Sequence, residues 1–230
     1  MCNECGFIGT DFEYKTLDNL YTDYRSESYN NERELYEPGY KDIAPLIGKS
    51  DLEVKSRLSN VESLLKKYID ISSIQTVIDF GGGDGSYAPE KLAGKDVYIV
   101  DISSEKPVRP EYKRVNKIED GFSFDYMQLC HILGHTMEPL EFLKELTKNL
   151  KSGGDLYIEV AQDRVDSDIA ELHKGSSNLR HTIHEHINLY TPRSIEALAK
   201  AAGLKRITVE KKEIDIGWTK VVIISVLFLK

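Results

Sequence analysis

The stretch VIDFGGGDGSY, residues 77–87, decides the fold. It begins as a short apolar run, which is typical of a buried parallel strand, and continues into a glycine-rich turn. Asp79 ends the predicted strand and is followed by Gly81, Gly83 and Gly85. Because glycine has no Cβ atom, such a turn lets the backbone approach a ligand closely. The stretch therefore predicts a strand, a tight turn into a helix, and a ligand site where the strand ends.

A second acid supports a nucleotide-type ligand. Asp101 closes the next predicted strand in VYIVDIS, about twenty residues further on, where a carboxylate can hydrogen-bond ribose hydroxyls. A glycine loop that only turned the chain would leave Asp79 and Asp101 unexplained at otherwise apolar strand ends. Together they indicate an adenosine-type cofactor. A dinucleotide site would carry a third glycine where Ser86 stands, which disfavours a nicotinamide cofactor.

The rest of the main domain alternates strand and helix patterns. Short apolar runs typical of buried strands occupy residues 76–80, 97–101, 124–130 and 155–160. Helical spacing of apolar residues predicts helices over residues 50–70, 139–152 and 192–203, the second of which stops at Gly153 and Gly154. Two further strands, residues 205–214 and 219–229, follow one another directly and should pair antiparallel. The order predicts a doubly wound, mostly parallel, seven-stranded Rossmann-like α/β sheet with an antiparallel last strand.

Composition limits the function classes. A chain of 230 residues can bury one good core. The net charge of -8 lacks the basic footprint that a phosphate backbone requires, so no nucleic-acid partner is expected. The longest apolar run, residues 221–229, is too short to span a bilayer, so no membrane partner is expected. The start MCNECG lacks the features of a secretory signal, and we expect a cytoplasmic protein.

The N-terminal residues 1–48 are predicted to form an extension, and residues 49–230 the main domain. Residues 11–42 are polar and rich in tyrosine, so they must wrap a core made elsewhere or become ordered over a ligand. Cys2 and Cys5 form half of a zinc knuckle, but a closed zinc site usually takes four ligands. We therefore favour free thiols and expect no metal; the alternative is a metal completed by a remote histidine or another chain.

Three blocks of sequence resemble the class I S-adenosylmethionine-dependent methyltransferases. The pattern acid-x-Gly-x-Gly-x-Gly at residues 79–85 resembles their first motif. Residues 124–160 look like their fourth strand, the following turn, a helix and the fifth strand. Residues 184–204, HEHINLYTPRSIEALAKAAGL, are similar to a segment of a branch that methylates sugars at carbon or oxygen. That branch often begins with zinc knuckles and a Tyr-rich lid, of which the N-terminal extension looks like a shortened version.

The resemblance implies S-adenosylmethionine as cofactor and S-adenosylhomocysteine as product. By this resemblance the glycines of the turn cradle the cofactor and Asp79 orients its methionine end. Asp101 holds the ribose, with Ile102 beside it in the cofactor site. An N-terminal helical lid is also implied, from which Tyr24 and Tyr29 could contact the substrate; aromatic packing on the core is the alternative for both.

The chain departs from the family pattern at three places. Pro107 and Pro110 leave little room for the usual helix after Asp101. The family's acidic adenine-contact motif is blurred, because Lys117 and Ile118 fall near its position. The family's glutamate before the turn histidine is replaced by Gly134.

All six histidines fall between His131 and His186, after strands whose carboxyl ends should meet at one edge of the sheet. Methyl transfer needs positioned partners and, where the nucleophile carries a proton, a base. We expect His186 with neighbouring Glu185 to supply that base, and His135 to be catalytic or to contact substrate. A solvated loop pair and a bracing side chain are the alternatives. A zinc-protease motif is absent, because Asn188 stands four residues after His184.

The predicted function is O-methylation of a small-molecule acceptor, a sugar or a nucleotide-activated intermediate of capsule or other surface-polysaccharide biosynthesis; the acceptor class rests on the resemblance. Methylation of carbon in a nucleotide-linked keto sugar is the alternative. A nicotinamide-dependent sugar oxidoreductase and a catalytically degenerate binding subunit are more distant alternatives. A nucleotide-linked acceptor would need a local basic pocket, for which Arg164, Arg180 and Arg193 are candidates.

Overall fold

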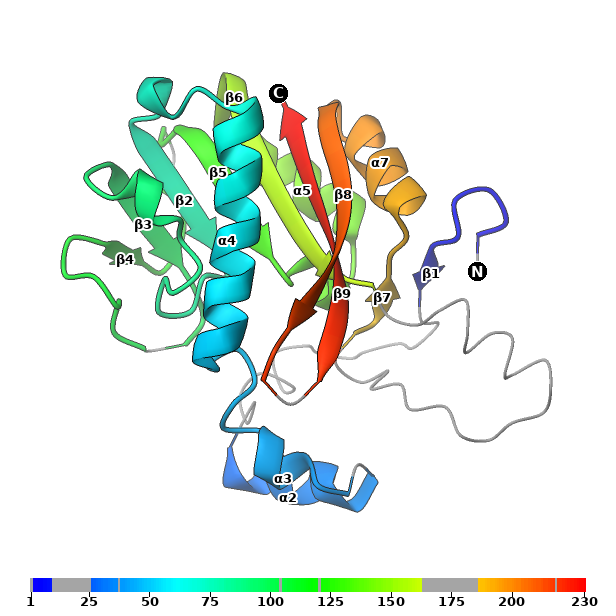
Figure 1. Ribbon diagram of the computed structural model, residues 1–230. Coiled ribbons are helices and arrows are strands. Elements are labelled where there is room, and N and C mark those ends of the chain that lie inside the picture. The colour runs from blue at the N-terminus through cyan, green and yellow to red at the C-terminus, as the bar shows by residue number, and fades with distance from the viewer. Residues whose placement is uncertain are drawn as a thin grey trace.

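The computed structural model describes residues 2–9, 26–36, 38–103, 105–119, 121–162, 186–217 and 219–230. Seven strands form one sheet in the order β4-β3-β2-β5-β6-β9-β8 (Figure 1). They are β2 (Thr76–Phe80), β3 (Asp96–Val100), β4 (Lys113–Val115), β5 (Phe124–Cys130), β6 (Leu150–Ala161), β8 (Lys205–Asp215) and β9 (Lys220–Leu229). The predicted seven-stranded sheet is confirmed. β4 escaped individual prediction because three residues carry no readable apolar pattern.

The strand directions also follow the prediction. Strands β2 to β6 run parallel, and β9 is antiparallel to both of its neighbours, β6 and β8. The antiparallel last strand therefore lies inside the sheet, and β8 forms the edge. The parallel strands all end at the same edge, where β9 begins. Any ligand of this sheet is expected outside that edge.

Helices cover both faces of the sheet (Figure 1). Helix α4 (Asp51–Tyr68) packs on one face through Val61, Leu64 and Leu65. Helices α5 (Pro139–Lys148) and α7 (Pro192–Ala201) pack on the other, where Leu143 and Ile195 are fully buried. The buried apolar residues form two clusters, one on each face, and together fix the sheet as a rigid platform.

Two helix predictions need correction. The turn after β2 does not lead into a long helix: residues 81–89 are irregular and only a short 3₁₀ turn, Glu90–Leu92, precedes β3. Pro89, in the middle of this short connection, has no backbone N–H to donate to a helix. Helix α5 ends at Lys148, and the glycines expected to stop it lie inside β6. Leu150 already pairs with Phe124 of β5, so sheet pairing rather than glycine ends this helix.

The described residues 105–112, between β3 and β4, contain no helix. This agrees with the expectation from Pro107 and Pro110. Helix α4 departs from its predicted apolar stripe towards both ends. Tyr68, its last residue, is exposed, whereas Glu53, Arg57 and Asn60 in its first ten residues are buried. Asn60 Nδ2 donates to Ser225 Oγ of β9 at 2.7 Å, so the helix reaches the sheet there through polar side chains.

The N-terminal extension contains α2 (Glu27–Tyr36), α3 (Tyr40–Ile43) and β1 (Ile8–Gly9). Figure 1 shows α2 and α3 beyond the end of the sheet where α4 and β9 begin. β1 pairs antiparallel with β7 (Asn188–Leu189), so the N-terminus contacts the segment that carries His186. No helix within the described ranges is long and apolar enough to cross a membrane.

Candidate functional site

The glycine turn lies at the carboxyl end of β2 and needs its glycines. Gly81 and Gly85 have φ angles of 71° and 81°, in the left-handed region that disfavours residues with a Cβ atom. A Cβ atom at Gly81 would overlap Cδ1 of Ile132, and one at Gly85 would lie 2.7 Å from Ile99. The backbone of this turn is thus held close to its neighbours at the sheet edge.

Asp79 carries a buried acceptor without a partner. Its side chain is 1% exposed, and Oδ1 accepts a long hydrogen bond from Gln128 Nε2 at 3.3 Å. Oδ2 has no hydrogen-bond partner among the described residues. Burial raises the pKa of Asp79 to about 7. A buried carboxylate in this state is poised for a cationic or hydrogen-donating ligand group, as the amino group of a bound methionine moiety would be.

Asp101 joins the glycine turn to the loop after β3. Its Oδ2 accepts from the backbone N–H of Gly83 at 2.8 Å, and Oδ1 accepts from Ser103 N at 2.7 Å. The next residue, Ile102, exposes 78% of its surface beside this carboxylate. An acidic group with remaining lone pairs and an exposed apolar side chain next to it suit a ribose and a planar base.

Arg114 of β4 was missed by the sequence reasoning. Its guanidinium donates to the carbonyls of Gly83, Ser103 and Glu105, and lies 3.7 Å from Asp101. It therefore clamps the two loops that carry the predicted cofactor residues. A lone arginine in a short, weakly patterned strand gave no signal in the sequence.

His135 and His186 meet at the end of β5. Their ring centroids are 4.9 Å apart with the rings inclined at 64°. A Cβ atom at Gly134 would lie 3.2 Å from His186 Cδ2, so the glycine at the family's glutamate position makes room for this imidazole. Glu185, the predicted partner of His186, lies outside the described residues, as do His173, His181 and His184.

Tyr29, a predicted substrate contact, lies on α2. Its hydroxyl accepts a hydrogen bond from Arg33 at 3.2 Å, and its ring is 6.4 Å from that of Tyr40. This is aromatic packing within the extension; contact with a substrate stays a prediction. Tyr24, Arg164 and Arg180 are outside the described residues. Within the part of the chain that the structure describes, no group of three or more His, Cys, Asp or Glu side chains could hold a metal.

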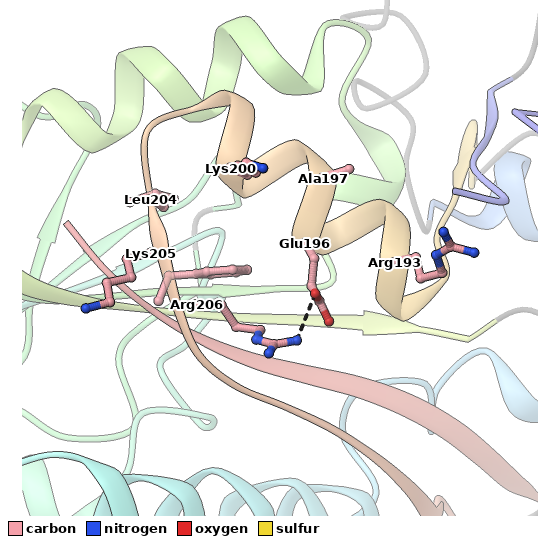
Figure 2. Close-up of a pocket in the computed structure, with 8 residues that line it drawn as sticks. Arg193, Glu196, Ala197, Lys200, Leu204, Lys205 and Arg206 are labelled. Atoms are coloured by element: carbon pink, nitrogen blue, oxygen red, sulfur yellow. Dashed lines mark ion pairs between the residues drawn. The ribbon is translucent and has the colours of Figure 1, made fainter. Parts of the chain in front are cut away.

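A cavity of about 510 Å³ lies elsewhere, between α7 and the start of β8 (Figure 2). Arg193 lines it, together with Lys200, Lys205 and Arg206. Arg206 is already paired with Glu196 at 2.8 Å, and Figure 2 shows Lys205 and Arg193 at opposite ends. The cations do not converge on one point, so the cavity does not form the basic pocket that a nucleotide-linked acceptor would need.

The fold is Rossmann-like, and a comparison with protein families identifies the chain as a methyltransferase. A family model described as "Methyltransferase domain" matches residues 45–209, and the chain belongs to this family. A search of curated proteins gave no match.

Solved structures share the fold. A 1,6-didemethyltoxoflavin-N1-methyltransferase from Burkholderia thailandensis, crystallised with S-adenosylhomocysteine, has a TM-score of 0.61 at 13% identity over 100% of this chain and 97% of that one. A magnesium protoporphyrin IX methyltransferase from Synechocystis PCC 6803, also with S-adenosylhomocysteine, has a TM-score of 0.57 at 15% identity over 92% and 99%. The N-methyltransferase NodS from Bradyrhizobium japonicum WM9 has a TM-score of 0.53 at 14% identity over 78% and 98%. The protein is an S-adenosylmethionine-dependent methyltransferase.

We expect Asp101→Ala to weaken S-adenosylhomocysteine binding at least about tenfold, because a hydrogen bond to a charged group contributes roughly 1.5–3 kcal/mol. Calorimetric titration measures the effect. Asp96→Ala is the matched control: Asp96 begins β3, the strand that Asp101 follows, and pairs with Lys113 on the surface. Equal affinities of wild type and Asp101→Ala would contradict the assignment.

Proposed function

We propose that the protein methylates an oxygen atom of a sugar or of a nucleotide-activated surface-glycan intermediate. The observation that carries this proposal is the His135–His186 pair at the carboxyl end of β5, two strands from Asp101. An alcohol must lose its proton as it is methylated, and an imidazole is the side chain suited to take it near neutral pH. The acceptor class is supported by the similarity of residues 184–204 to the sugar-methylating branch.

In this proposal the two halves of the edge have separate tasks. The glycine turn, Asp79 and Asp101 hold the cofactor, whose methyl group is carried on a cationic sulfur and leaves a neutral thioether behind. His186, assisted by Glu185, takes the acceptor proton, while His135 packs against it and fixes its ring. Tyr24 and Tyr29 of the extension cover the acceptor. Carbon beside a keto group is the second candidate for the methylated atom, since it too must lose a proton.

We expect His186→Ala to lower kcat by roughly 10²–10⁴-fold, the usual contribution of a general base, with S-adenosylhomocysteine affinity unchanged. The assay measures transfer of labelled methyl from S-adenosylmethionine to a panel of nucleotide-linked sugars, and product analysis distinguishes oxygen from carbon methylation. Lys205→Ala, in the distant cavity, serves as control. Full activity of His186→Ala would reject the base, and cofactor binding without transfer to any acceptor would favour a degenerate binding subunit.

A further inference from the structure

His131 holds an unusual backbone conformation at the edge of the site. It directly follows β5 and has a φ of 58°, the one positive value among the non-glycine residues described. Its backbone N–H donates to the carbonyl of Glu159 at 2.8 Å, which holds this conformation against β6. Residues with a Cβ atom rarely adopt the left-handed region, and where they do the site is often functional.

Glu159 is a buried carboxylate held ionised. It is 1% exposed; Oε1 accepts from Arg57 Nε at 2.6 Å, and Oε2 accepts from the Tyr157 hydroxyl at 2.7 Å. Burial alone would raise the pKa of Glu159, but Arg57 and the hydrogen bonds from His131 and Tyr157 outweigh it and lower the pKa to about 2. Glu159 therefore stays an acceptor-only group at any physiological pH.

The imidazole of His131 is oriented by this carboxylate. Nε2 lies 3.3 Å from Glu159 Oε1, and because the carboxylate can only accept, it favours the tautomer that carries the proton on Nε2. The other nitrogen, Nδ1, is then a hydrogen-bond acceptor. The side chain is 29% exposed, so the ring is not sealed inside the protein.

The charges around His131 keep it neutral. Burial, then Arg57 of α4, lowers its pKa; Glu159 of β6 opposes them, and His186 adds to the lowering. His131 is therefore neutral, and Glu159 beside it favours the tautomer that carries the proton on Nε2.

We propose that His131, oriented by Glu159, is a specificity-determining residue whose Nδ1 accepts a hydrogen bond from a donor group, a hydroxyl or amine, of the methyl acceptor. This inference rests on the proposed function: His186 serves the reacting hydroxyl, and His131 binds a second donor of the same molecule. The proposal requires an acceptor that carries a second donor besides the reacting hydroxyl, and one lacking this donor would leave Nδ1 unpaired.

His131→Asn is the informative variant, because asparagine tolerates a positive φ and so preserves the fold. In histidine-¹⁵N-labelled protein saturated with S-adenosylhomocysteine, NMR should show signals, absent from His131→Asn, of a neutral imidazole protonated at Nε2 from pH 6.5 to 8.5. A cationic ring at pH 7, or a proton on Nδ1, would overturn the proposal. This measurement needs no methyl acceptor.

The second measurement uses an acceptor that the wild type methylates. His131→Asn should raise its KM at least about tenfold, with kcat and S-adenosylhomocysteine affinity within threefold of wild type, and the rise should vanish for an analogue lacking the second donor. An unchanged KM would overturn the role of His131 while leaving the methyltransferase proposal intact. Failure of the wild type to methylate any panel member would instead count against the proposed acceptor, and the NMR result would still decide the tautomer.

Discussion

Asp79→Asn should abolish measurable S-adenosylhomocysteine binding and, at the same time, stabilise the free protein above neutral pH. Burial raises the pKa of Asp79 from 3.8 to about 7. Between these values the folded state binds more protons than the unfolded state, so stability falls as pH rises and the loss is complete above about pH 7. At about 1.36 kcal/mol per pKa unit, the loss is on the order of 4 kcal/mol. Asparagine removes the charge and with it the pH-dependent loss.

The expected gain is smaller than that figure, because the new amide brings donors that find no ready partner; we expect about 1–3 kcal/mol at pH 8 and none below pH 4. Urea unfolding at pH 5 and pH 8 measures the free energy of unfolding, and calorimetry measures binding. Asp96→Asn, on an exposed residue, should change neither. A variant that still binds S-adenosylhomocysteine as wild type does would show that Asp79 does not hold the methionine end.

The unfavourable burial of a carboxylate explains why the positions of the two acids at the sheet edge could be predicted from the sequence. A carboxylate at the end of an apolar strand is unfavourable for folding alone, so its presence in the sequence signals a ligand. Asp79 and Asp101 both satisfied that rule, and the parallel strand order put them at one edge. The wrong expectation of a helix after the turn came from treating the glycines as a complete motif and overlooking Pro89.

The buried polar group formed by Arg57, Glu159 and His131 could not be predicted in the same way. Arg57 and Glu159 are 102 residues apart in the chain, and each alone reads as a solvent-facing charge on an amphipathic element. Helical spacing correctly placed Leu64 and Leu65 inside but could not show that the same stripe continues as Glu53 and Arg57. Only pairing across the sheet reveals that these charges are buried together. His131 could not be singled out from the sequence for the same reason, since its partner is Glu159.

Glu159→Ala should destabilise the protein by about 3–5 kcal/mol, because it leaves the buried Arg57 guanidinium without its main counter-charge. The Arg57 side chain is 7% exposed, and its remaining carboxylate, Glu53, is 3.4 Å away. Burial of a charge without a partner is far more costly than loss of the pair as a whole. The double variant Arg57→Met with Glu159→Leu should therefore recover most of the lost stability.

Urea unfolding of the wild type, Arg57→Met, Glu159→Leu and the double variant closes a thermodynamic cycle that isolates the coupling energy of the pair. Glu213→Ala provides the comparison: Glu213 pairs with Lys220 at 3.1 Å on the surface, and exposed pairs contribute only about 0–1 kcal/mol. If Glu159→Ala cost no more than Glu213→Ala, the ion pair would not be a buried element of the fold. The double variant should still bind S-adenosylhomocysteine, because Asp79 and Asp101 do not pair with Arg57, but it should lose the fixed tautomer of His131.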